Sequence, residues 1–209
     1  MKIKEFVRVV GDTHGLIYDY MDLVKDIPYS VQLGDMGFNY EKLNALDSDK
    51  HRFIGGNHDN YHNLPPHVLG DYGTHNLGGL EFFYVRGAKS IDWKYRTLGV
   101  DMWAEEEIGL HEYDNLEKEW LKAKPSLVLT HTCPTSLISQ ISSITHWDGE
   151  LLIPDITSQM LDTLFRKHQP KAWYFGHFHR SKQVVVDGCR FRCLAELEYV
   201  DLDFEGNEL

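Results

Sequence analysis

The sequence contains no apolar run of the roughly 18 residues that a membrane-spanning helix requires. The opening segment Met1-Lys2-Ile3-Lys4-Glu5 leads into a strand-like run without the apolar stretch of a signal peptide. Cysteine is scarce as well, with only Cys133, Cys189 and Cys193 in 209 residues. An odd number of thiols without a secretion signal indicates free cysteines in a reducing compartment. We therefore expect a cytoplasmic protein without a membrane partner.

Positive charge is also in short supply. The 21 Lys and Arg residues stand against 32 Asp and Glu, which gives a formal net charge of −11. Nonspecific binding of long nucleic acids depends on cationic neutralisation of phosphates, so we expect no long nucleic acid as a partner. No linker, low-complexity tract or repeat divides the chain, and its 42% hydrophobic content is that of a packed globule. These features predict a single domain over residues 1–209.

The first third of the chain alternates β-rich runs with helical segments. Strand-like runs at residues 6–10, 30–33 and 52–54 each end at glycine followed by polar residues. Helical spacing at residues 16–24 and a short helix around residues 40–46 separate these runs. This rhythm is typical of βαβ units, in which functional groups gather at the carboxyl ends of the strands.

The second half of the chain adds strands of mixed direction. Strands are expected at residues 80–85, 127–129 and 172–175, with helices that Asp114 and Asp155 could cap. Valine-rich and aromatic runs on either side of Asp187-Gly188 predict a β-hairpin. The pattern as a whole indicates mixed sheets of about nine or ten strands with helices outside.

One long segment, residues 132–154, has no clear period. A loop of that length in a compact domain is usually functional. It contains His146, Trp147 and Asp148, which could form a wall of the pocket. Trp147 could stack on a base or an aryl group of a substrate, or it could serve packing alone.

Residues that can bind metal follow five of the predicted strands. They are Asp12-Thr13-His14, Asp35, Asn57-His58-Asp59, His131 and His177-Phe178-His179. Carboxylates, an amide carbonyl and imidazoles suit Mn²⁺, Fe or Zn²⁺, and the lack of thiolate disfavours a soft-metal site. These groups exceed the need of one ion, whereas a pair of ions about 3.5 to 4 Å apart that share a carboxylate would use them.

The glycine-bearing blocks around these residues resemble the calcineurin-like metallophosphoesterase family. The blocks are Gly11-Asp12-Thr13-His14-Gly15, Gly34-Asp35, Gly56-Asn57-His58-Asp59, Thr130-His131 and Gly176-His177-Phe178-His179, in family order. The resemblance implies an α/β fold of four layers, α/β/β/α, in which two mixed β-sheets pack face to face with helices on both outer sides. It also implies a metal-dependent phosphoric ester hydrolase.

The resemblance assigns a role to each motif residue. Asp12, His14 and His179 would hold the first ion, and Asp35 would bridge to the second. Asn57, His131 and His177 would complete the shell of the second ion. His58 would face the substrate as a catalytic residue without binding metal, and Asp59 would orient His58. Two divalent cations are thus the expected cofactors, with manganese favoured and iron or zinc as alternatives.

The expected reaction is hydrolysis of phosphate esters, as a phosphodiesterase or a phosphatase. A hydroxide that bridges the two ions would attack phosphorus in line, and His58 would protonate the leaving group as general acid. Serine/threonine protein phosphatases of the family carry an arginine in the second block, which reads Gly34-Asp35-Met36-Gly37-Phe38-Asn39 here. The chain therefore resembles small bacterial and phage phosphoesterases more closely.

Further candidates and alternatives accompany this interpretation. Arg86, Lys89, Arg96 and Arg180 are candidate phosphate contacts, although each alone is more often a solvated surface residue. Within the enzyme class, the chain could be a nuclease or nucleotide phosphodiesterase that acts on single-stranded or short nucleic acid. A single-zinc hydrolase of carbonyl compounds would leave most strand ends unexplained. In a different class, the fold could serve as a catalytically silent interaction scaffold, but such scaffolds usually lack a ligand or the general acid.

Overall fold

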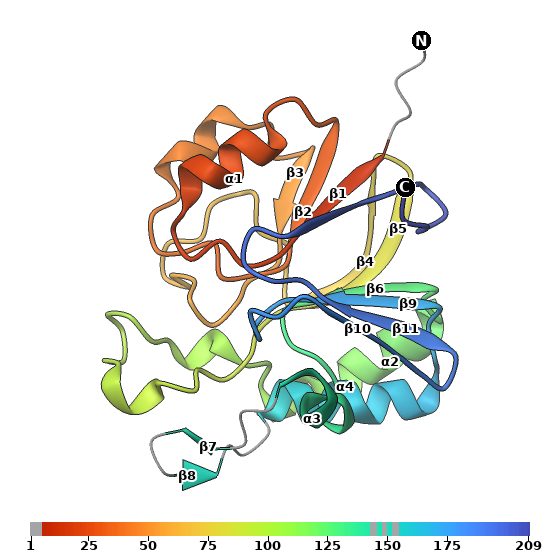
Figure 1. Cartoon of the computed structure of the whole chain (residues 1–209). Helices are drawn as coiled ribbons and strands as arrows, with labels where there is room; N and C mark the ends of the chain where they lie inside the picture. The colour runs from red at the N-terminus through yellow and green to blue at the C-terminus, as the bar shows by residue number, and fades with distance from the viewer. Residues whose placement is uncertain (1–5, 143–145, 148–149, 152–154) are drawn as a thin grey trace.

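The structure is a computed structural model that describes residues 6–142, 146–147, 150–151 and 155–209 (Figure 1). Most of its strands and helices form two sheets and two outer helical layers. The expected α/β architecture of two mixed sheets flanked by helices is confirmed. Among the described residues, every helix is too short or too polar to cross a membrane.

The smaller sheet has four strands in the order β12-β1-β2-β3. Its members are β1 (Val7–Val10), β2 (Tyr29–Gln32), β3 (His51–Phe53) and β12 (Tyr199–Leu202). The first three strands run parallel and β12 is antiparallel to β1. Helix α1 (Ile17–Val24) and the 3₁₀ helix at Glu41–Ala45 form the connections, so the predicted βαβ rhythm is confirmed, with a 3₁₀ turn as its second helix.

The larger sheet has six strands in the order β10-β11-β9-β6-β5-β4. These are β4 (Tyr72–Leu77), β5 (Leu80–Val85), β6 (Leu127–Thr130), β9 (Ala172–Phe175), β10 (Lys182–Val186) and β11 (Cys189–Cys193). Strands β6 and β9 are buried at every position, which explains their unbroken apolar runs. The hairpin at Asp187-Gly188 is confirmed, with positive φ at both turn residues.

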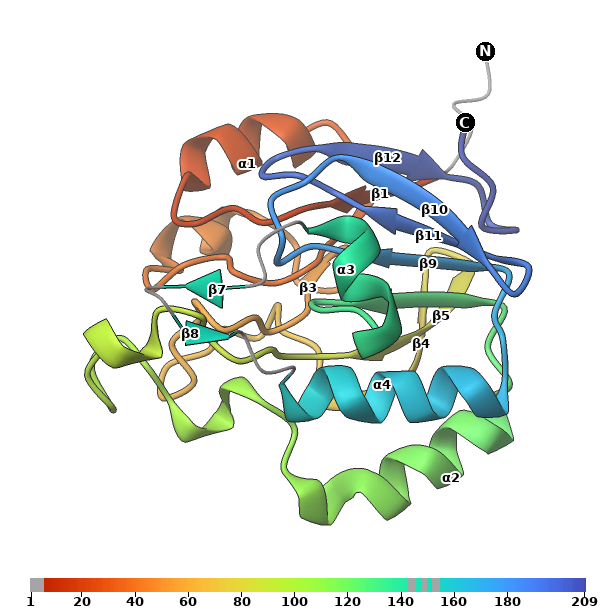
Figure 2. The ribbon, with the colours of Figure 1, turned by 60° about the horizontal axis from the view of Figure 1, so that its bottom comes forward.

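Three hydrophobic clusters fill the spaces between the four layers. The cluster between the sheets includes Val9 and Val31 from one sheet and Leu129 from the other. A second cluster joins the larger sheet to α2 (Tyr113–Ala123), α3 (Ile138–Ile141) and α4 (Ile156–Lys167), which cover its outer face in Figures 1 and 2. The third lies under α1 on the smaller sheet. A two-stranded ribbon of β7 (His146–Trp147) and β8 (Glu150–Leu151) lies apart from both sheets.

The predicted helix caps differ in outcome. Asp155 caps α4, because its side chain accepts a hydrogen bond from the Ser158 N–H. Helix α2 begins at Tyr113, before the predicted cap, which puts Asp114 in the first turn. Cys133, Cys189 and Cys193 are buried and unpaired, as expected.

Candidate metal centre

The seven predicted ligands converge at the carboxyl ends of the parallel strands. Asp12 and His14 follow β1, Asp35 follows β2 and Asn57 follows β3. His131 comes directly after β6, and His177 and His179 follow β9. Parallel strands in the two packed sheets thus bring residues from five distant segments to one place.

The first group of donor atoms comes from Asp12, His14, Asp35 and His179, and one ligand atom of each lies within 4.8 Å of the others. The Nε2 atom of His179 lies 3.1 Å from Asp12 Oδ2 and 2.7 Å from His14 Nε2. The Nε2 atom of His14 lies 3.5 Å from Asp35 Oδ2. The Asp12 carboxylate is held in turn by the His177 N–H, 3.0 Å from both oxygens.

The second group surrounds the other oxygen of Asp35. The Nε2 atom of His131 lies 3.3 Å from Asp35 Oδ1 and 3.0 Å from Asn57 Oδ1. The ring of His177 lies against the His131 ring at a centroid distance of 5.1 Å. One carboxylate oxygen of Asp35 therefore faces each group, as a bridging ligand would.

The two ring nitrogens of His131 face different partners. The Nδ1 atom of His131 lies 2.8 Å from the Leu33 carbonyl oxygen, which only accepts, so Nδ1 carries the hydrogen. The Nε2 atom then faces two oxygen atoms, Asp35 Oδ1 and Asn57 Oδ1. A metal ion bound by Nε2 would lie beside both of these oxygens. A backbone carbonyl bonded to the far ring nitrogen is also the usual environment of a metal-binding histidine.

The carboxylates of the site favour positive charge beside them. Burial alone would raise the pKa of Asp12, but hydrogen bonds from His14 and His179 outweigh it and hold that pKa well below its usual range. Burial opposes the charge of His14 as well, yet Asp12 and Asp35 raise its pKa to about 9. Burial lowers the pKa of His177 to about 3, which keeps this imidazole neutral and able to bind metal.

The backbone is strained where ligands are placed. Among the described residues, seven that are not glycine have positive φ, and four of these are His14, Asp35, His177 and His179. Such conformations cost of order 1 to 3 kcal/mol each and persist where surrounding structure enforces them. Their concentration at the predicted ligands indicates that the fold positions these side chains for function.

Two glycines leave room for the carboxylates. A Cβ atom at Gly56 would collide with the Asp35 carboxylate and backbone. One at Gly176 would collide with Asp12 Oδ1. These contacts explain why both positions in the motifs are glycine.

A comparison with known families agrees with this geometry. The sequence model of the family described as calcineurin-like phosphoesterase matches residues 7–181, which is most of the chain. The chain belongs to this family. It is accordingly a metal-dependent phosphoric ester hydrolase, and the family uses a dinuclear site of divalent metal ions.

Solved structures support the fold. A dimetal phosphatase from Danio rerio is similar with a TM-score of 0.53 at 12% identity, over 98% of this chain and 91% of that chain. A protein of Thermus thermophilus is similar with a TM-score of 0.51 at 10% identity, over 97% of this chain and 96% of that chain. At these identities the likeness shows the fold alone. No curated protein matches the sequence.

Asp59 of this phosphoesterase has partners other than the expected one. Its Oδ2 atom accepts hydrogen bonds from the backbone N–H groups of Asp35 (3.0 Å) and Gly56 (2.7 Å). Its Oδ1 atom accepts from the Gly37 N–H and the Tyr40 hydroxyl, both at 3.2 Å. Both oxygens are thus committed to the turns that carry Asp35 and Asn57. These bonds join the two turns, and the hypothesis that Asp59 orients the His58 ring stays a prediction.

His58 lies beside the ligands with its ring outside both donor groups. Its backbone N–H donates to Asp35 Oδ1 at 2.6 Å, while its ring lies 5.0 Å from the His14 ring between centroids. Burial lowers the pKa of His58 against the opposing charge of Asp35. On its other side the ring stacks with Phe38 at 6.5 Å and an interplanar angle of 26°.

Phe38 is a site residue that the sequence analysis did not single out. Its side chain is 43% exposed beside His58, and Trp103 packs against it at 5.3 Å between ring centroids. The one sequence feature that could have pointed to Phe38 was its place in the second block, three residues after Asp35.

Two of the four candidate phosphate contacts are engaged elsewhere. Arg86 is buried, donates to Asp71 at 2.5 Å and to the Glu105 carbonyl, and covers the Tyr61 ring. The Arg96 side chain is 5% exposed and donates to the backbone carbonyls of Asp101 and Asn57. Neither is a solvated surface residue or free to bind phosphate. Lys89 and Arg180 are exposed.

The structure describes only part of residues 132–154, the segment expected to form a wall of the pocket. The segment begins with a turn at Thr135–Leu137 and continues through α3. Asp148 and the side chains of His146 and Trp147 lie outside the described residues, so their proposed contact with substrate stays a prediction.

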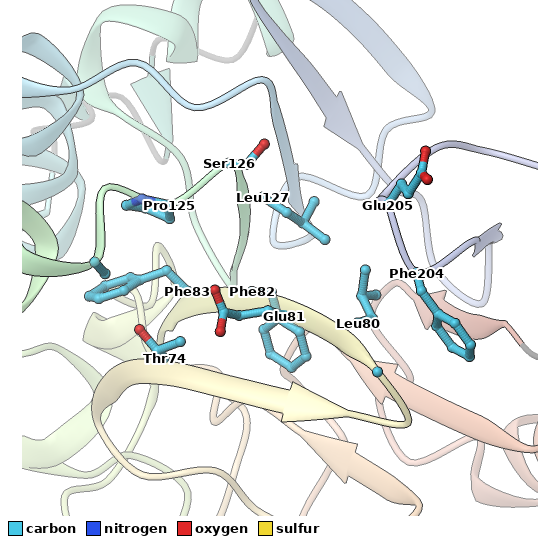
Figure 3. Close-up of a pocket in the computed structure, with 12 residues that line it drawn as sticks. Thr74, Leu80, Glu81, Phe82, Phe83, Pro125, Ser126, Leu127, Phe204 and Glu205 are labelled. Atoms are coloured by element: carbon cyan, nitrogen blue, oxygen red, sulfur yellow. The ribbon is translucent and has the colours of Figure 1, made fainter.

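A cavity lies away from the predicted ligands (Figure 3). It is lined by the β4–β5 hairpin, the start of β6 and the turn at Phe204 and Glu205. None of the predicted site residues lines it.

Proposed function

We propose that this chain hydrolyses small phosphate esters at a pair of divalent ions, bound by the two donor groups that share Asp35. The observation that carries the proposal is the division of that carboxylate, with Oδ2 toward His14 and Oδ1 toward His131. Two bound ions would supply Lewis acidity toward the phosphate and activate water for in-line attack. Oxygen and nitrogen donors without thiolate suit manganese first, with iron or zinc as alternatives.

The residues of the chain would divide the remaining work. Asp12, His14 and His179 would hold one ion, Asn57, His131 and His177 the other, and Asp35 both. The strained backbone at four of these residues keeps their donor atoms convergent before substrate arrives, so little reorganisation is needed during the reaction. Asp59 would keep the turns of Asp35 and Asn57 in register.

His58 would donate a proton to the oxygen of the leaving group. Its ring is the imidazole beside the ligands that lies outside both donor groups. A general acid accelerates the departure of poor leaving groups by about 10²- to 10⁴-fold, whereas p-nitrophenolate leaves without help. We expect His58→Ala to spare metal binding and to slow alkyl esters far more than p-nitrophenyl esters. The exposed His111 supplies the control, since His111→Ala removes an imidazole that contacts Glu112 and is not a predicted ligand.

Phe38 favours substrates whose leaving group has a flat apolar face. A group that departs on the His58 side would meet the exposed Phe38 ring, and stacking of this kind contributes about 0.5 to 1.5 kcal/mol. Nucleotides and aryl esters are such substrates, so a nucleotide phosphodiesterase is the second candidate. Lys89 and Arg180, both exposed, are the remaining candidates for phosphate contact. Three unpaired thiols suit a reducing compartment, and the cytoplasm stays our expectation.

Parallel assays of p-nitrophenyl phosphate and bis-p-nitrophenyl phosphate with added Mn²⁺ test the proposal. Asp35→Asn protein serves as the blank, because it weakens the shared ligand. Faster turnover of the diester would identify a phosphodiesterase, and faster turnover of the monoester a phosphatase. Absence of metal-dependent turnover on both esters, together with failure to bind two ions, would overturn the proposal in favour of a silent scaffold.

A further inference from the structure

The Asn57 side chain is oriented by residues from outside the ligand motifs. Its Nδ2 atom donates to Ser90 Oγ at 3.0 Å, which leaves Oδ1 directed at His131 Nε2. Ser90 lies beyond the end of β5 and is 1% exposed. The oxygen and nitrogen ends of an amide have nearly the same shape, so its contacts alone decide which end faces an ion.

The Ser90 hydroxyl can accept from Asn57 but has no hydrogen left to give it. Ser90 Oγ donates to Glu106 Oε2 at 2.9 Å. It accepts from Asn57 Nδ2 and from Arg96 Nη1. A hydroxyl has one hydrogen and two acceptor lone pairs, and all three are used here. A rotated Asn57 would place its carbonyl oxygen against an oxygen without a free hydrogen.

Arg96 and Glu106 keep the hydroxyl in this state. Glu106 Oε1 accepts from the Trp103 N–H at 3.1 Å and lies 3.4 Å from Arg96 Nη1. The side chains of Arg96 and Glu106 are 5% and 6% exposed, so their pairing is shielded from water. Arg96 also donates to the backbone carbonyl of Asn57 at 3.2 Å. The three residues therefore contact both the side chain and the main chain of this ligand.

We propose that Ser90, Arg96 and Glu106 form a positioning group that keeps the carbonyl oxygen of Asn57 turned toward the second ion. This inference rests on the proposed dinuclear function. Without the Ser90 hydroxyl, the amide could rotate and present N–H groups to a cation, which repel it. Loss of a residue that orients a metal ligand typically weakens metal binding 10- to 100-fold.

Calorimetric titration of metal-free protein with Mn²⁺ tests the inference directly. Wild-type protein should bind two ions, and Ser90→Ala should weaken one of the two events at least tenfold while the other changes less than twofold. Ser90→Thr keeps the hydroxyl and should restore binding. If Ser90→Ala protein fails to fold, Glu106→Gln serves in its place. This change keeps the side-chain volume and removes the charge, and it should weaken the same binding event.

An Asn57→Asp background separates orientation from a merely structural role. A carboxylate offers oxygen in either orientation, so Ser90→Ala should cost less than twofold there. The trio of Ser181, Arg192 and Glu198 has the same chemistry without a ligand amide, which makes Ser181→Ala the matched control.

The outcomes separate the two proposals. Suppose that wild-type protein binds two ions. The positioning role alone is then overturned if Ser90→Ala leaves both affinities unchanged, or if Ser90→Ala weakens binding as much in the Asn57→Asp background as in wild-type protein. Fewer than two ions in wild-type protein would overturn the dinuclear site and the inference with it.

Discussion

Replacement of Asp59 by asparagine distinguishes the observed role of this carboxylate from the one that its motif suggested. The two side chains have the same shape, but asparagine turns one acceptor oxygen into an amide nitrogen that only donates. Asp59 is fully buried and accepts four hydrogen bonds, two at each oxygen. Whichever way the new amide is turned, its nitrogen faces one or two buried donors, such as the Gly37 N–H and the Tyr40 hydroxyl.

The magnitude follows from those donors. A buried donor without a partner costs about 1 to 3 kcal/mol, so Asp59→Asn should lower the free energy of unfolding by roughly 3 kcal/mol. For a chain of this length, that corresponds to a fall in Tm of about 6 to 12 °C. Calorimetry of the metal-free protein measures it, with Asp22→Asn as control because the Asp22 side chain is 75% exposed. The control should change stability by less than about 0.5 kcal/mol.

A different result would refute this reasoning. If Asp59 served chiefly to orient His58, Asp59→Asn would leave Tm unchanged and would slow only esters with poor leaving groups. An unchanged Tm would therefore restore the pairing that the motif suggested.

Three further changes test separate parts of the account. Phe38→Leu should raise KM for p-nitrophenyl phosphate about 2- to 10-fold in steady-state assays and leave glycerol phosphate unchanged, whereas Phe204→Leu should affect neither. Gly176→Ala should push Asp12 aside and weaken Mn²⁺ binding in calorimetry. An unchanged affinity would contradict the collision expected between the new Cβ atom and Asp12 Oδ1. Burial of His51 beside Ser30 lowers its pKa below 6.5, against the pull of Asp47. The unfolded chain therefore takes up this proton first, so Tm should fall as pH drops below about 6.5, and His51→Gln should lessen the fall.

The strand ends could be predicted because their signals are local. An apolar run, a glycine and a polar ligand lie within a few residues of one another, and parallel strands bring such ends together. Asp155 as a helix cap and the Asp187-Gly188 turn are local in the same sense. These features depend on backbone geometry that neighbouring residues specify.

The rest of the site depends on contacts between distant segments. The segment from Arg86 to Glu112 has short 3₁₀ turns and no hydrophobic period, so nothing in its pattern shows that Ser90 and Glu106 meet Asn57. The partners of Asp59 are backbone N–H groups, which every residue except proline carries and no motif marks. Phe38 could not be assigned either, because exposure of one aromatic side chain is decided by the packing around it.

Hydrolysis of p-nitrophenyl phosphate by metal-free protein during stepwise addition of Mn²⁺ tests the central claim most directly. The shared Asp35 carboxylate predicts little turnover at one ion per chain and full turnover at two, with Asp35→Asn inactive at both. Turnover that saturates at one equivalent, or that survives in Asp35→Asn, would contradict a site of two ions joined by this carboxylate.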